Sequence, residues 1–384
     1  MKIDIIKILI SLLIVTSTIA LGDNKPIVSS QDYLIKNKDL GIRINKWHIV
    51  DYYSHSGSHS WWCGPEDANK PEDDYIYYYD SYLESLPLNF DTSTDSITLS
   101  FWYDIDTSND YNGGDTCYLY IESDQQAPII IWGYDSPYDS NGWTKAIIDL
   151  SEYRGHTNFR MRFYFGADMD SLVDDGWNID DVVIKSTYVD VDLISPVEFN
   201  VWLPEGWTQM PSYSDNNDWH KYIYGNDSVA RRYNVPPEQN SIDELISPIK
   251  SAADFTKLYL SYWTDFNAYN PSPYNTYGKV LGSTDGGDHW NYFINQYQDD
   301  FKGNETFEIT SWAAGEENIR IKWLLEQDEP DDVLWWLLDS IHIYGDMTRY
   351  DFKDDVEHGE NGWYVYPESA VEMSSIGQIK ALLK

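Results

Sequence analysis

The chain has 384 residues, which is enough for two domains of ordinary size. It carries 64 acidic side chains against 26 basic ones, a net charge of −38 at pH 7, so it should repel nucleic acid and anionic membrane surfaces. Its 32 tyrosines and 17 tryptophans supply much more apolar area than a disordered chain contains, so we expect it to fold.

The N-terminus has the pattern of a secretory signal peptide. Lys2 and Lys7 stand beside an apolar run over residues 8–15, and small residues follow at Ala20 and Gly22. An uncleaved anchor is the alternative, but the apolar run is short for a membrane span. We therefore expect export to the extracellular space or the cell surface, with no membrane insertion after cleavage.

From residue 45 onward the local pattern is that of β-strands. Residues 117–123 are short, aromatic and β-branched, and residues 158–165 alternate apolar with basic side chains, as half-buried strands do. Turn-forming residues separate such segments, as in "YDSNGW" at 138–143. Apart from residues 376–384, no stretch has a helical stripe. The pattern predicts an all-β protein with jelly-roll β-sandwiches.

The chain contains the same domain twice. "TLSFWYDID" at 98–106 matches "YLSYWTDFN" at 259–267, which pairs Phe101 with Tyr262. Three further matches follow in the same order at a near-constant spacing; they pair 122–126 with 283–287, 158–165 with 318–325 and 177–184 with 336–343. Ordered matches of this kind predict a tandem duplication of one jelly-roll domain.

The duplication divides the chain into five segments. They are a signal peptide (1–22), an N-terminal segment (23–44), a first β-sandwich (45–190), a second β-sandwich (191–346) and a partial third repeat or C-terminal tail (347–384). The last segment is too short to complete a sandwich alone. Either the chain is truncated there, or the tail adds to a neighbouring sheet.

The two cysteines, Cys63 and Cys117, both fall in the first sandwich. In an exported protein such a pair forms a disulfide more often than it stays as two free thiols. Two cysteines cannot form a structural zinc site by themselves. We expect a disulfide if the Cα atoms lie roughly 4.4–6.8 Å apart, and two free thiols otherwise.

Three motifs resemble a known family. "WHIVDYYSHSGSHSWWCG" at 47–64 and "WNIDDV" at 177–182 resemble the MAM-like domains of the immune inhibitor A family of secreted metallopeptidases. "FKDDVEHGENGW" at 352–363 resembles the segment that opens such a domain. The resemblance implies tandem MAM-like jelly rolls. It covers accessory domains only, because none of the eight histidines begins the zinc-binding H-E-x-x-H motif of the peptidases. We therefore expect no enzymatic activity.

Aspartate is unfavourable inside a β-strand, yet Asp180 and Asp339 occupy the same position in the closing strand of each copy. The resemblance implies a structural Ca²⁺ between this aspartate and an acid near the opening strand. The implied ligands are Glu198 and Asp339 in the second copy, and Asp180 with Asp181 in the first, where an opening acid before Trp47 is missing. Alternatively, these aspartates cap turn amides or pair with an arginine.

Aromatic loops offer a separate kind of site. Residues 132–143, with Trp132 and Trp143 at their ends, and residues 269–277 are rich in Tyr and Trp, side chains on which sugar rings stack. The alternative is that these aromatics fill the sandwich cores.

Three functions are compatible with these patterns. The leading hypothesis is a secreted or cell-surface adhesion protein without catalytic activity, whose partner is a cell-surface protein or glycan. The second is a carbohydrate-binding module protein. The third is a fragment or targeting part of an immune inhibitor A-like metallopeptidase that lacks the catalytic domain.

Overall fold

The computed structural model describes residues 45–65, 74–75, 80–107, 114–168, 173–211, 218–233, 241–268, 277–327, 333–359 and 362–368. The signal peptide and the N-terminal segment predicted over residues 1–44 lie outside the described residues. Almost all regular structure is β, which confirms the predicted fold class; the exceptions are a 3-10 turn, η1 (Ser151–Tyr153), and a one-turn helix, α3 (Thr310–Ala313). No described helix has the length and apolar character needed to cross a membrane.

The first domain is a sandwich of two sheets. One sheet has the strand order β21-β3-β9-β5-β6, with β21 (Trp363–Glu368), β3 (Asp80–Ser85), β9 (Arg160–Gly166), β5 (Thr116–Ser123) and β6 (Gln126–Asp135). The facing strands are β1 (Asn45–Val50), β2 (Ser60–Pro65), β4 (Ser96–Thr107), β7 (Tyr138–Asp139), β8 (Thr144–Asp149) and the first part of β10 (Gly176–Val197). Buried and less buried residues alternate strictly along β4, so one of its faces lines the core.

The second domain repeats this arrangement. Its five-stranded sheet has the order β11-β14-β19-β16-β17, with β11 (Thr208–Pro211), β14 (Ser241–Ile246), β19 (Arg320–Gln327), β16 (Tyr277–Ser283) and β17 (Tyr292–Tyr297). The facing strands are β12 (His220–Tyr224), β13 (Asp227–Tyr233), β15 (Tyr259–Ala268), β18 (Phe301–Glu308) and the first part of β20 (Val333–Asp354). The repeat pairs Phe101 with Tyr262, and both are buried in the equivalent strands β4 and β15.

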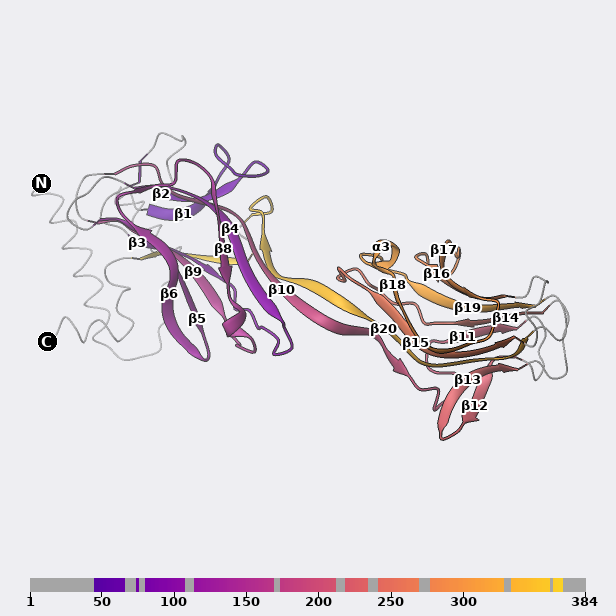
Figure 1. The fold of residues 1–384 in the computed structure, drawn as a ribbon. Helices are drawn as coiled ribbons and strands as arrows, with labels where there is room; N and C mark the ends of the chain where they lie inside the picture. The colour runs from indigo at the N-terminus through magenta and orange to yellow at the C-terminus, as the bar shows by residue number, and fades with distance from the viewer. Residues whose placement is uncertain are drawn as a thin grey trace, which may run out of the picture.

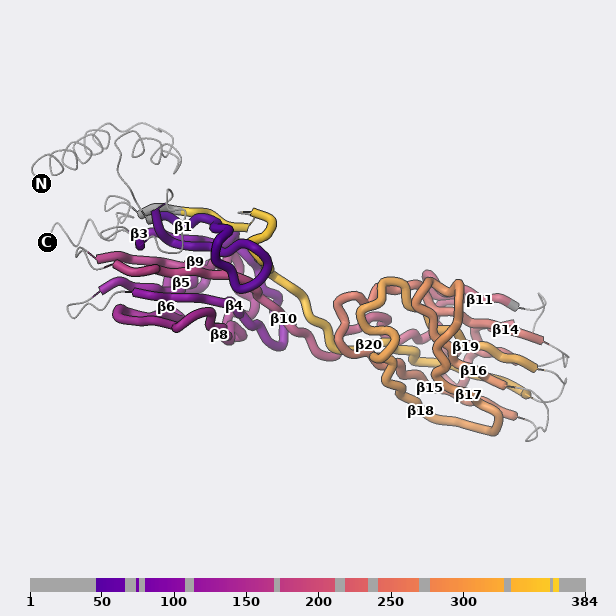
Figure 2. The backbone as a smooth tube through the Cα atoms, turned by 90° about the horizontal axis from the view of Figure 1, so that it is seen from above, coloured from indigo at the N-terminus to yellow at the C-terminus, as the bar shows by residue number. Residues whose placement is uncertain are grey.

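Two long strands join the domains. β10 and β20 are antiparallel partners from Val182↔Asp354 to Val197↔Ile341, with several bulges on the way. Figure 1 shows them as a ribbon that runs from one sandwich into the other, and Figure 2 shows the same connection from above. The facing strands of the two domains are therefore parts of a single 11-stranded sheet.

The end of the chain returns to the first domain. β21 pairs with β3, and the side chain of Trp363 is only 6% exposed within the first core. Trp207 holds the matching place beside β11 in the second core. The predicted boundaries need a correction: residues 352–368 complete the first sandwich rather than open a third, so the second domain is inserted into the first. Of the two alternatives for the tail, addition to a neighbouring sheet is the one observed.

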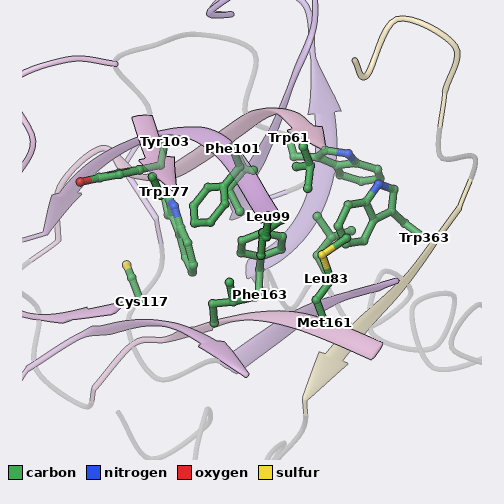
Figure 3. Packing of buried hydrophobic residues seen from close by; sticks show 14 of the residues in the cluster. Trp61, Leu83, Leu99, Phe101, Tyr103, Cys117, Met161, Phe163, Trp177 and Trp363 are labelled. Carbon is green, nitrogen blue, oxygen red and sulfur yellow. The ribbon is translucent and has the colours of Figure 1, made fainter. Parts of the chain in front are cut away.

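Aromatic side chains fill the first core. Phe163 lies 5.0 Å from Phe101, 5.7 Å from Trp177 and 5.8 Å from Trp363, measured between ring centroids. Figure 3 shows these rings packed together with Met161. The second core is a separate cluster in which Trp323, the repeat counterpart of Phe163, lies 5.8 Å from Trp207.

The disulfide predicted between Cys63 and Cys117 is not formed, and both residues are buried free thiols. Cys63 lies on β2 and Cys117 on β5, which belong to opposite sheets of the sandwich. Facing sheets pack about 10 Å apart, whereas a disulfide needs Cα atoms within about 7 Å. Burial raises the pKa of both thiols well above its usual range, so they behave as small apolar side chains.

The insertion topology makes Trp363 part of the first core although the repeat pattern assigns it elsewhere. Trp363→Ala should destabilise the first domain by about 3–5 kcal/mol, the usual effect of removing a buried tryptophan. Hydrogen–deuterium exchange should then rise in β3, β5 and β9. The matched variant Trp207→Ala should raise exchange in β14, β16 and β19 instead. Unchanged exchange in the first domain of Trp363→Ala would contradict the topology.

Candidate ligand-binding pocket

A concave pocket of about 280 Å³ lies on the outer face of the first domain's part of the long sheet. Four strands (β2, β4, β7 and β10) and three connecting segments build it. Its lining residues are Tyr52, Tyr53, Trp62, Asp104, Asp106, Asp139, Gly142, Asp175, Gly176 and Asn178. The pocket therefore combines aromatic rings with carboxylates, and its lining contains no basic side chain.

The aromatic wall is held by ring packing and hydrogen bonds. Tyr53 stacks on Trp143 with centroids 5.1 Å apart, and Tyr52 meets the edge of Trp62 at 6.4 Å. The indole N–H of Trp62 donates to the Asp175 backbone carbonyl at 2.8 Å. Both wall tyrosines belong to the connection between β1 and β2, which we call the 51–59 loop.

Carboxylates fix the 51–59 loop at both ends. The backbone N–H groups of His55 and Ser56 donate to Asp180 Oδ2 at 2.9 and 3.1 Å. The N–H groups of Ser58 and His59 donate to Glu357 Oε1 at 2.6 and 2.8 Å. Hydrogen bonds from His59 and Ser58 lower the pKa of Glu357 to about 2, so this carboxylate stays charged and keeps holding the loop.

Acidic side chains crowd the open side of the pocket. Burial, followed by the charges of Asp174 and Asp139, raises the pKa of Asp106 to about 6. Burial and then the charge of Asp174 also raise the pKa of Asp175. Carboxylate oxygens of Asp106, Asp174 and Asp175 lie within 4.8 Å of one another. Like charges this close destabilise one another's ionised form.

A β-bulge explains how the closing strands accommodate an aspartate. Asp180 pairs with Trp102 and Asp339 with Trp263, and the strand register shifts beside each of these pairs. The next residues, Asp181 and Ser340, both have a φ of 50°. A bulge of this kind changes the direction in which a side chain points.

In the first domain, backbone amides bind the carboxylate of Asp180. Asp180 is fully buried and accepts three backbone N–H groups, from His55, Ser56 and Asp181. Asp181 accepts the His55 ring nitrogen and the Ser56 hydroxyl, both at 2.8 Å. Ligand atoms of His55, Asp180 and Asp181 do lie within 4.8 Å of one another, but N–H donors already surround the aspartates. Asp180 thus caps turn amides, the alternative weighed for it.

In the second domain, the carboxylate of the equivalent aspartate is only partly satisfied. Asp339 is 8% exposed, and its buried Oδ1 has no hydrogen-bond partner in the described part of the chain. Burial, followed by the charges of Glu198 and Asp227, raises the pKa of Asp339 to about 6. The 51–59 loop has no counterpart there, because a two-residue turn at 225–226 joins β12 to β13. Asp227, at the start of β13, was not anticipated from the sequence.

The structure separates the two tryptophans predicted to bind sugar. Trp132 packs toward the core, with its centroid 5.1 Å from Phe101 and 4.7 Å from Tyr103. Trp143 lies on the outer side, where it supports Tyr53. They form no common platform, and only Trp143 belongs to the surroundings of the pocket.

No protein-family model and no curated protein matches the chain. Similar solved structures include the K3 cleaved adhesin domain of Lys-gingipain from Porphyromonas gingivalis w83, with 14% identity, 40% of this chain and 98% of that chain covered, and a TM-score of 0.31. The N-terminal CBM22-1–CBM22-2 tandem domain of Paenibacillus barcinonensis Xyn10C is 9% identical to this chain. The match covers 78% of this chain and 91% of that chain, with a TM-score of 0.26. The structure of TmCBM61 in complex with β-1,4-galactotriose is 11% identical to this chain. The match covers 37% of this chain and 89% of that chain, with a TM-score of 0.26.

Similarity at these scores does not identify a ligand, so the residues of the site must do so. Fold and pocket together define an all-β protein of two sandwich domains with a concave acidic and aromatic pocket on the first.

The raised pKa of Asp106 predicts a pH-dependent stability. The folded protein keeps this proton up to about pH 6, whereas an unperturbed aspartate releases it near 3.8, so stability should fall as the pH rises through this window. Asp106→Asn should therefore stabilise the protein at pH 7.5, by about 1 kcal/mol at most because the site is partly solvated, and should have no effect at pH 3.5. Thermal melting at both pH values measures this.

Asp149→Asn is the matched control. Hydrogen bonds from Ser151 lower the pKa of this exposed aspartate, so its replacement should lower the melting temperature at pH 7.5. A lower melting temperature for Asp106→Asn at pH 7.5 would show that the carboxylate is stabilising and contradict the repulsion described above.

Proposed function

We propose that this chain is an exported binding protein without catalytic activity, and that the pocket of the first domain takes a carbohydrate. The observation that carries the proposal is the composition of the pocket, which is lined by Tyr52, Tyr53 and Trp62 together with carboxylates and the Asn178 amide. Sugars present apolar faces that pack on aromatic rings, and hydroxyls that donate to carboxylates.

The hydrogen bonds of Asp104, one of the pocket acids, favour a binding role over hydrolysis. Asp104 Oδ2 accepts the Tyr53 hydroxyl, and Oδ1 accepts the Ser140 hydroxyl. A carboxylate with both oxygens occupied holds the aromatic wall in place, so it is poorly suited to act as one member of a catalytic acid–base pair.

The expected location agrees with this role. A signal peptide over residues 1–22 would export the chain, and the large negative charge keeps an extracellular protein soluble and away from anionic surfaces. We propose a cell-surface glycan as the partner, in an adhesion role like that implied by the resemblance to MAM-like domains. The same binding role would suit a targeting part of a longer secreted enzyme.

We also propose that the second domain holds a structural Ca²⁺ at Asp339. Its unpartnered Oδ1 and the nearby carboxylates of Glu198 and Asp227 are hard oxygen ligands of the kind that Ca²⁺ accepts at flexible angles. A bound cation would offset both the burial and the neighbouring charges that raise the pKa of Asp339. The first domain needs no cation at this position, because loop amides bind Asp180.

Calcium should therefore stabilise the second domain. Excess Ca²⁺ should raise the melting temperature above that in chelator, with a gain of about 2.7 kcal/mol at a hundredfold excess over the Kd. Asp339→Asn should melt no lower than wild type in chelator, since it removes a destabilising charge, and should lose the response to Ca²⁺. The matched variant Asp180→Asn should keep that response. Loss of the response in Asp180→Asn alone would contradict this assignment.

A glycan screen tests the binding function. Immobilised protein should retain at least one class of oligosaccharide without shortening it, and Tyr53→Ala should weaken retention by about tenfold or more because one ring of the wall is lost. Phe293→Ala is the control, since this phenylalanine is 63% exposed on β17 of the other domain. Hydrolysis of the retained glycan would contradict the non-catalytic part of the proposal, and silence across the screen would contradict the rest.

A further inference from the structure

The charge of the pocket restricts what it can bind. Asp106, Asp139 and Asp175 line it together with Asp104, and Asp174 stands directly behind them. The pocket lining contains no lysine or arginine, and the ammonium of Lys145 lies 5.9 Å from the ring centroid of Trp102. An anionic ligand such as a uronate or a sulfated sugar would be repelled.

Several of these carboxylates lack the partners that usually accompany partly buried acids. Asp104 accepts two hydroxyls, and Asp139 accepts the Asn141 backbone N–H at 2.6 Å. Asp106, Asp174 and Asp175 have no side-chain hydrogen bond and no ion pair to any residue that the structure describes. Asp106 and Asp175, which line the same pocket as the aromatic wall, can therefore still accept hydrogen bonds from a ligand.

We propose that the ligand of this pocket is an amino sugar, whose ammonium group binds between Asp106 and Asp175 while its ring packs against the aromatic wall. The inference rests on the proposed carbohydrate function and adds the charge of the ligand to it. A sugar with a free amine can pair its ammonium with the carboxylates and pack its ring on the aromatic wall. A neutral sugar leaves the carboxylates facing one another, and a lone metal ion makes no use of the rings.

Two matched probes separate charge from sugar shape. Glucosamine oligosaccharides and fully N-acetylated oligosaccharides of the same length share a backbone and differ in the amine charge. Calorimetry at pH 6 on the full-length protein should show the glucosamine form bound at least about tenfold more tightly. Raising the salt concentration should weaken that binding, because salt screens partly exposed charge pairs.

Variants of the pocket should separate the contribution of the carboxylates from that of the aromatic wall. Asp106→Asn and Asp175→Asn should each reduce affinity for the glucosamine form severalfold and leave the acetylated form unaffected, whereas Tyr53→Ala should weaken both. Asp149→Asn, outside the pocket, should change neither affinity. Far-ultraviolet circular dichroism and melting curves confirm that each variant is folded.

The outcomes distinguish this inference from the function on which it rests. Equal affinity for the two oligosaccharides would overturn the amino-sugar inference and leave carbohydrate binding in place. Binding of neither would overturn both. Tighter binding of a lysine-rich peptide than of the glucosamine oligosaccharide would also overturn the inference, since the pocket would then recognise a protein.

Discussion

The antiparallel pairing of β10 with β20 is the constraint on which the rest of the structure depends. Each strand starts in one sandwich and ends in the other, and their backbone groups pair over most of that length. A strand this long cannot leave its N–H and C=O groups unpaired without a large free-energy cost, so neither domain can detach from the shared sheet. The two hydrophobic cores stay separate, but the backbone that connects them is one continuous ladder.

This pairing also places the segment that follows the second domain beside the opening strands of the first. β20 delivers Glu357 to the 51–59 loop, so Ser58 and Glu357 are neighbours despite their distance in sequence. The same segment carries Trp363 into the first core. The wall formed by Tyr52 and Tyr53 therefore depends on residues that are synthesised after the second domain. Neither the first core nor its pocket is complete until the second domain has been made.

The alternation of apolar and polar side chains predicts the strands, because half-buried strands have this period of two. The repeat correctly pairs Phe101 with Tyr262, which occupy equivalent buried positions. Strand partners do not follow from such a pattern, which is why it leaves open whether residues 347–384 begin a third repeat or add to a neighbouring sheet. The disulfide failed for a related reason: burial of Cys63 and Cys117 can be anticipated, but which sheet each strand joins cannot. The pocket was missed because its acids come from separate segments and meet only in the fold.

The two copies accommodate the same strand aspartate in different ways, and that difference decides which domain carries the pocket. In the first domain, a long connection between β1 and β2 folds over the sheet, caps Asp180 with its amides and places His55 on Trp102 with ring centroids 3.7 Å apart. The same loop contributes the wall of the pocket. In the second domain, a tight turn joins the equivalent strands, and Oδ1 of Asp339 has no hydrogen-bond partner among the described residues. One loop length thus decides whether this strand aspartate is bound by loop amides or keeps a carboxylate oxygen without a partner.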